Sequence, residues 1–142
     1  MLRIHALVIE QLEDELQFEQ RLPLSSYDVL VHLSEASGGQ RRMSELADDV
    51  LMTKSGLTRV VDVLEKQGLV ERVRSEEDGR GFYARLTTAG RKKFRAAHKV
   101  HVRGVRARFL DKLSDGQLES LAGAWHAVSP DLFPEDGYPV RQ

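Results

Sequence analysis

The chain contains no cysteine, only four prolines and few aromatic residues, which make up 6% of its 142 residues. Without cysteine, the chain has no internal disulfide, no thiolate zinc site and no thiol of its own for sensing oxidants. It also lacks any apolar run long enough to cross a membrane. Residues 1–20 carry five acidic side chains in place of the apolar block of a signal peptide, so we expect a cytoplasmic protein.

Motifs of common enzymes are also missing. The sequence has no nucleophile elbow and no phosphate-binding glycine loop, and no histidine has an acidic neighbour that would suggest a triad. Adjacent carboxylates such as those of Asp48 and Asp49 diverge on a helix and are interpreted as solvated charge. We therefore expect neither enzyme activity nor a cofactor.

Charge is segregated along the chain, although the formal net charge is only −1. Residues 41–106 contain 16 basic and 9 acidic side chains, whereas the remainder contains 5 basic and 13 acidic side chains, so the two parts carry +7 and −8. A basic middle with acidic ends suits a protein whose centre meets phosphates. The plainer alternative is a solvated surface of mixed charge.

A helix-turn-helix pattern lies within this basic middle. Ser44 is a candidate N-cap for a short helix, and Thr53 is a candidate N-cap for the next. Gly68 is expected to end that second helix. Apolar residues recur at i, i+3, i+4 and i+7 along it, so one face should be buried; they are Leu57, Val60, Val61 and Leu64.

The opposite face of this second helix is the candidate surface for reading DNA. With about 100° of rotation per residue, Ser55, Arg59, Asp62 and Lys66 lie across from the apolar stripe, and Lys54 and Thr58 flank it. Side chains in the first half of a recognition helix touch base edges in the major groove. Ser55, Thr58 and Arg59 occupy that half.

A hairpin with a charged tip follows the second helix. The segments LVERVR and FYARL are extended in character and are separated by residues 75–81, which predicts two strands and a long turn. Arg80 stands between two glycines and can enter a narrow minor groove. Asp78 is placed to orient the Arg80 guanidinium through a charge-assisted bond. Helix-turn-helix and hairpin together predict a winged helix.

The run from Leu22 to about Phe94 resembles the MarR family of transcription regulators. Five segments carry the resemblance in register over about half the chain: LPLSSYDVLVHL at 22–33, the SELA start at 44, TKSGLTRVVDVLEKQGLVER at 53–72, Asp78-x-Arg80, and Leu86-Thr87-x-x-Gly90. One departure is visible, because many relatives have glycine in the turn that here reads Val50-Leu51-Met52. The geometry of this turn is therefore expected to differ slightly.

The resemblance implies a mainly α fold with a small β-wing, in one domain over residues 1–142. The winged helix-turn-helix core would cover about residues 22–90, flanked by dimerisation helices at about 1–20 and 88–129, with an irregular tail at 130–142. A homodimer would place two recognition helices about one DNA turn, or 34 Å, apart on an inverted-repeat operator. The implied function is that of a ligand-responsive repressor that binds double-stranded DNA.

Relatives of this kind commonly bind a small aromatic or phenolic effector between the dimerisation helices and the winged helix. Tyr27 and His32 are the candidate pocket residues, with His5 and Trp125 as further options, although such side chains are often plain core. His98 and His101 are three residues apart, a spacing that can chelate zinc with His5, His32 or His126. No motif fixes those other ligands, so we assign no metal site.

A winged helix that binds another protein is the rival interpretation. Such a module has no need for Arg80 at the wing tip or for Arg59 and Lys66 on the exposed helix face, and it often carries apolar residues there. The cationic side chains therefore favour DNA as the partner.

Overall fold

The computed structural model describes residues 2–75 and 81–130. It comprises six α-helices, two short 3-10 helices and three strands in this described part. In chain order they are α1 (Leu2–Gln20), α2 (Leu24–Glu35), η1 (Ser37–Gly39), β1 (Gln40–Arg42), α3 (Met43–Asp49), α4 (Lys54–Lys66), β2 (Val70–Arg74), β3 (Phe82–Leu86), α5 (Thr88–Arg108), η2 (Leu110–Lys112) and α6 (Asp115–Val128).

The described residues divide into two compact units, one within Met1–Gly104 and the other within Val105–Gln142. The first unit holds a hydrophobic core built from α2, α3, α4, the sheet and the buried faces of α1 and α5. Its largest fully buried side chains are leucines and valines; they include Leu16, Leu30, Leu33, Leu46, Leu57, Leu64 and Val61. Of the helices described, none is both long and apolar enough to span a membrane.

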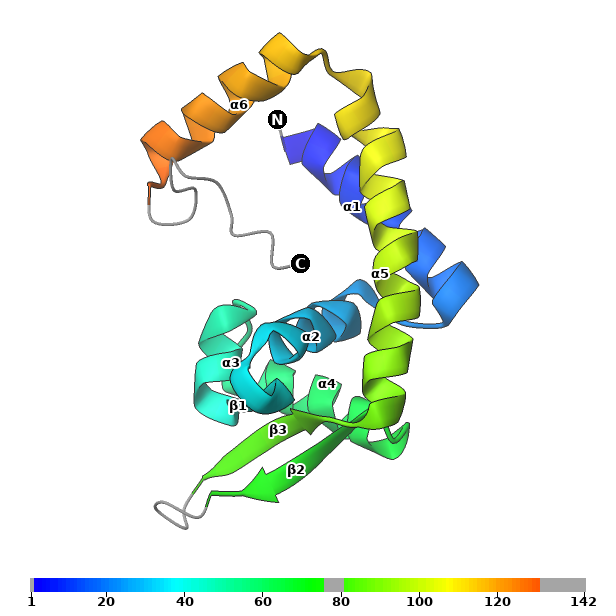
Figure 1. The fold of residues 1–142 in the computed structure, drawn as a ribbon, viewed down its shortest axis with the longest axis vertical. Helices are drawn as coiled ribbons and strands as arrows, with labels where there is room; N and C mark the ends of the chain where they lie inside the picture. The colour runs from blue at the N-terminus through cyan, green and yellow to red at the C-terminus, as the bar shows by residue number, and fades with distance from the viewer. Residues whose placement is uncertain (1, 76–80, 131–142) are drawn as a thin grey trace. The chain divides into compact units, whose positions relative to one another are not determined.

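The sheet is antiparallel and has the strand order β1-β3-β2. Strands β2 and β3 form the predicted hairpin, with Val70 opposite Leu86 and Arg74 opposite Phe82. Figure 1 shows these two strands running side by side away from the helices, with α5 starting where β3 ends. Strand β1 pairs with the other edge of β3 and was not predicted from the sequence. The fold is therefore the expected mainly α winged helix with a small β-wing.

The expected N-cap of the first helix in the helix-turn-helix was wrong. Helix α3 begins at Met43, and its N-cap is Arg42, whose side chain makes no capping hydrogen bond. Because Arg42 is also the last residue of β1, the chain passes directly from strand to helix. Ser44 therefore lies inside the first turn of α3 instead of preceding it.

The turn between α3 and α4 contains a residue in the left-handed backbone conformation, and this residue is leucine instead of glycine. Leu51 has φ of 52° and a side chain that is 94% exposed. The left-handed conformation costs a residue other than glycine about 1–2 kcal/mol. Its neighbours Val50 and Met52 pack on the core, so Leu51 is held in this conformation from both sides.

Helix α5 is joined to the end of the winged helix through the Leu86-Thr87-x-x-Gly90 motif. The Thr87 hydroxyl accepts a hydrogen bond from the Gly90 N–H at 3.0 Å and lies 2.7 Å from the Gly68 carbonyl oxygen, to which it can donate. The Thr87 N–H also donates to the Leu69 carbonyl at 3.1 Å. The Leu69 backbone packs so closely against Gly90 that only glycine fits at this position, because a Cβ there would lie 2.0 Å from the Leu69 carbonyl oxygen.

The second unit contains the end of α5, η2 and α6. Ser114 and Gln117 form a capping box at the start of α6. No residue of α6 is buried within the described chain. The Phe109 and Trp125 rings stack with centroids 6.4 Å apart. This unit therefore leaves most of α6 uncovered.

Candidate nucleic-acid interface

Helix α4 has one buried face and one polar face, as the sequence predicts. The Thr53 side chain caps the helix by accepting a hydrogen bond from the Gly56 N–H at 3.1 Å. Leu57, Val61 and Leu64 are buried in the core. The helix ends at Lys66, and Gly68 follows with φ of 70°, as expected for a C-terminal glycine.

The DNA-binding residues predicted on this helix are all exposed. They are Lys54, Ser55, Thr58, Arg59 and Lys66. The Thr58 hydroxyl donates to the Lys54 carbonyl at 2.8 Å, while the Ser55 hydroxyl lies 3.3 Å from that of Thr53. Within the described residues, the charged ends of Arg59 and Lys66 form neither a hydrogen bond nor an ion pair. These two cations are therefore available to a ligand of opposite charge.

Arg72 connects the polar face of α4 to the wing and was not predicted from the sequence. From strand β2 its guanidinium donates to Asp62 at 2.6 Å and forms an ion pair with Glu65. Its backbone N–H donates to the same Glu65 carboxylate at 3.1 Å. Burial opposes the charged form of Arg72, but the hydrogen bonds with Asp62 and Glu65 outweigh this effect and raise its pKa. Arg72 thus partly neutralises the acidic side chains of α4 and fixes the helix against the strand.

The wing tip lies outside the described residues. Arg80, the predicted minor-groove residue, and Asp78, its predicted orienting partner, both belong to that segment. The hairpin closes just before it, where the Ser75 N–H donates to the Gly81 carbonyl at 2.9 Å. The two predicted strands are therefore present on either side of this segment, and the roles of both residues stay predictions.

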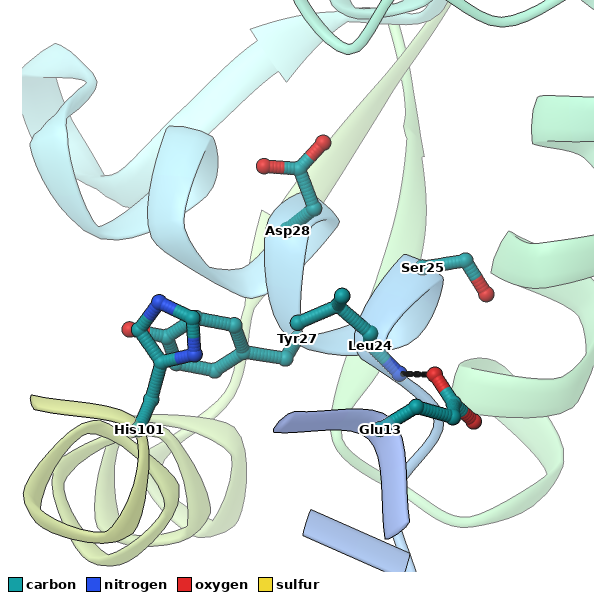
Figure 2. Close-up of a pocket in the computed structure, with 6 residues that line it drawn as sticks. All are labelled: Glu13, Leu24, Ser25, Tyr27, Asp28 and His101. Atoms are coloured by element: carbon teal, nitrogen blue, oxygen red, sulfur yellow. Dashed lines mark hydrogen bonds between the residues drawn. The ribbon is translucent and has the colours of Figure 1, made fainter. Parts of the chain in front are cut away.

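A pocket of about 460 Å³ lies on the first unit, formed by α1, α2 and α5. Its lining residues are Glu13, Leu24, Ser25, Tyr27, Asp28 and His101. Figure 2 shows the Tyr27 and His101 rings facing each other and the hydrogen bond from the Leu24 N–H to Glu13, which measures 2.7 Å. The lining set contains two carboxylates and neither lysine nor arginine.

Tyr27 is the centre of a small aromatic and imidazole cluster between α2 and α5. Its ring centroid lies 4.7 Å from that of His101, and its hydroxyl lies 2.9 Å from Nδ1 of His98. Burial raises the pKa of Tyr27 to about 12, with smaller contributions from Asp28 and Glu35. The phenol is therefore protonated at neutral pH and can donate to His98.

His101 should make folding depend on pH. Burial, followed by the neighbouring His98, lowers the pKa of His101 from its ordinary value of 6.5. As pH falls below 6.5, the unfolded chain binds a proton at this residue more readily than the folded chain, so stability decreases. Well above pH 6.5 both states are neutral at His101, and this loss is absent.

Thermal unfolding of wild type and His101→Phe between pH 5 and 7.5 tests this expectation. The phenyl ring keeps a ring contact with Tyr27 but cannot be protonated. The drop in melting temperature on acidification should be smaller in the variant than in wild type. If the melting temperatures of the two proteins fell in parallel as the pH is lowered, His101 would not contribute to the pH dependence of stability.

The remaining candidate residues lie apart from this cluster or outside the pocket lining. His32 does not line the pocket but lies 3.8 Å from Asp28, one helical turn away on α2. His5 is exposed on α1, and Trp125 belongs to the second unit. In the described part of the chain, no group of three or more histidine, aspartate or glutamate side chains is arranged to hold a metal ion.

Comparison with known proteins gives relatives over most of the chain. The sequence profile of the MarR family matches residues 22–81. AbsC, a MarR family transcriptional regulator from Streptomyces coelicolor, is 36% identical with a TM-score of 0.84, covering 92% of this chain and 88% of its own. Sco3205, a regulator of the same family and organism solved in complex with DNA, is 33% identical with a TM-score of 0.85, covering 96% of this chain and 85% of its own.

A shorter match is found to the HTH-type transcriptional regulator PrsX of Escherichia coli, which is 38% identical over 66 residues. That match covers 46% of this chain and 40% of PrsX, so this chain corresponds to about two fifths of that curated relative. The relatives are transcriptional regulators, in agreement with the expectation that the chain is not an enzyme. The identity and coverage shared with AbsC and Sco3205 show that the chain belongs to the MarR family of transcriptional regulators.

Proposed function

We propose that the protein binds double-stranded operator DNA through α4 and represses transcription in the cytoplasm. The observation that carries this proposal is the polar face of α4, where Arg59 and Lys66 are exposed and Arg72 engages the acidic side chains beside them. Helix α4 would enter the major groove, and Arg80 at the wing tip would enter the minor groove. The DNA complex of Sco3205, a relative with 33% identity, supports this choice of partner.

The binding form in this proposal is a homodimer. Two observations, one from each unit, support it. On α1, the apolar side chains of Ile4, Leu7 and Phe18 are exposed, that of Phe18 by 90%. On α6, no residue is buried and Val128 is largely exposed. A second copy would remove this apolar surface from water, and two-fold symmetry would match an inverted repeat.

Release from DNA would be controlled by a small molecule in the pocket beside Tyr27 and His101. A phenolic or other aromatic ligand would stack on these rings. Because the lining contains Glu13 and Asp28 and neither lysine nor arginine, the pocket favours a neutral phenol over an aromatic carboxylate. Titration of the operator complex with neutral phenols and matched benzoates tests this preference.

Selection from a random double-stranded DNA library tests DNA binding directly. Purified protein at near-physiological salt should enrich an inverted repeat with half-sites about one turn apart. A single unpaired half-site would contradict the dimer, and no enrichment by well-folded protein would favour the rival, a winged helix that binds another protein. Sedimentation of the free protein supplies an independent measure of the dimer.

Arg59→Ala should weaken operator binding by about 1–3 kcal/mol and relax the preference at particular base pairs. The reason is that an exposed arginine in the first half of a recognition helix is placed to bond a guanine edge. Binding to operators with single base changes, measured by fluorescence anisotropy, checks both parts. Equal weakening on all sequences would instead make Arg59 a phosphate contact.

A further inference from the structure

We propose that Leu51 makes an apolar contact with DNA at the edge of the major groove, an inference that rests on the proposed DNA-binding function. Leu51 adopts a left-handed backbone conformation with φ of 52°, and among the described residues it is the most exposed large hydrophobic side chain, at 94%. Each feature is unfavourable in the free protein. Glycine would avoid both, so the folded chain by itself gives no reason for leucine.

The core does not require this side chain. Val50 is buried and Met52 packs against the core, so the residues on either side of Leu51 supply the apolar contacts of this turn with the core. The turn is also fixed through its backbone. The Leu51 N–H donates to the Asp48 carbonyl at 3.3 Å, and the Met52 N–H donates to the Ala47 carbonyl at 3.0 Å. Leu51 is therefore carried outward on a turn of defined geometry.

The position of the turn determines what Leu51 can meet. It lies two residues before Thr53, the N-cap of α4, and three residues before Lys54. When the first residues of a recognition helix contact base edges, the chain that enters the helix passes the rim of the groove beside one sugar-phosphate strand. The side chain of Leu51 then projects from the part of the protein that first meets this strand.

The chemistry at that rim suits leucine. A thymine C5 methyl group and the carbon atoms of deoxyribose are apolar surfaces beside the phosphates, and methyl contacts contribute to base selection. Lys54 and Ser55 supply polar groups on the adjacent turn of α4, whereas Leu51 supplies the apolar one. Burial of its exposed side chain on these carbon atoms would strengthen the complex.

Leu51→Gly separates the contact from the fold. Glycine accepts the left-handed conformation, so the melting temperature should stay equal to that of wild type or increase. Affinity for the selected operator should nevertheless fall about fivefold, because the apolar contact is lost. Leu51→Met keeps an apolar side chain of similar reach and should bind within about twofold of wild type. Leu51→Asn tolerates the backbone conformation but is polar, so it should bind as weakly as the glycine variant.

Uracil in place of thymine, one operator position at a time, distinguishes the two apolar surfaces. If Leu51 contacts a methyl group, one substitution should weaken wild type and leave the glycine variant unchanged. If it contacts deoxyribose, the difference between the two proteins should persist at every position. Both patterns support the inference.

Equal operator affinity of wild type and Leu51→Gly would overturn the inference while leaving the proposed function intact. A variant that binds DNA normally but represses less in reconstituted transcription would overturn it in favour of a protein contact. Failure of wild type to select any DNA sequence would remove the proposed function and this inference together, so the two failures are distinguishable.

Discussion

Replacing Gly90 with alanine should destabilise the folded protein by about 3 kcal/mol, the upper end of the usual overpacking cost. The added Cβ would lie 2.0 Å from the carbonyl oxygen of Leu69 and 2.8 Å from Cδ1 of Leu86. The Leu69 carbonyl cannot simply move away, because it accepts the Thr87 N–H at 3.1 Å. Urea unfolding followed by circular dichroism measures the change.

Gly116→Ala is the matched control for this prediction. Gly116 also lies in the first turn of a helix, α6, but a Cβ there would have no heavy atom within 4 Å. Alanine is the better helix former, so this variant should be unchanged or more stable by up to about 1 kcal/mol. A similar loss in both variants would mean that contact with Leu69 is not the cause.

Replacing Arg72 with alanine should lower operator affinity about 100-fold, which corresponds to about 2.7 kcal/mol. Without the guanidinium, the carboxylates of Asp62 and Glu65 stand uncompensated on the helix face that is proposed to meet DNA phosphates. The helix also loses its connection to strand β2. Stability should fall by only about 1 kcal/mol, because these ion pairs are partly exposed to solvent.

Salt dependence and a combined variant identify the cause of the Arg72 defect. The difference from wild type should shrink as salt rises, since repulsion between carboxylates and phosphates is screened. Adding Asp62→Asn and Glu65→Gln to Arg72→Ala should restore most of the affinity. If Arg72→Ala bound the operator as tightly as wild type, the role given to Arg72 would be refuted. If the added amides left the defect unchanged, its cause would be a displaced α4 and not repulsion between carboxylates and phosphates.

Features fixed by short stretches of sequence were predictable. Thr53 and Gly68 mark the two ends of α4 because capping depends on the residues at the helix ends. The buried face of α4 followed from the spacing of Leu57, Val61 and Leu64, and its polar face followed from the same spacing. The two strands of the hairpin were predicted for a similar reason, since extended character is visible on both sides of a charged turn.

Features that depend on contacts between distant segments were not predictable. Strand β1 has the sequence Gln-Arg-Arg and no apolar alternation, so it is a strand only because it pairs with β3. Its presence moved the start of α3 to Met43 and made the Ser44 cap prediction wrong. The ion pair between Arg72 and Asp62 joins residues ten positions apart and forms only because the hairpin packs beside α4. The sequence signal that was available for this ion pair is the presence of Asp62 and Glu65, three residues apart on one helix.

The joint between α5 and the winged helix has a mechanical consequence. At its base α5 is tied to the end of α4 through Thr87, Leu69 and Gly90, and further along it is tied to α2 by the 2.9 Å bond between His98 and Tyr27. Two attachments more than two helical turns apart prevent the helix from pivoting on either one. We therefore expect the basal half of α5 to move together with α2 and the C-terminal end of α4 when the protein changes conformation.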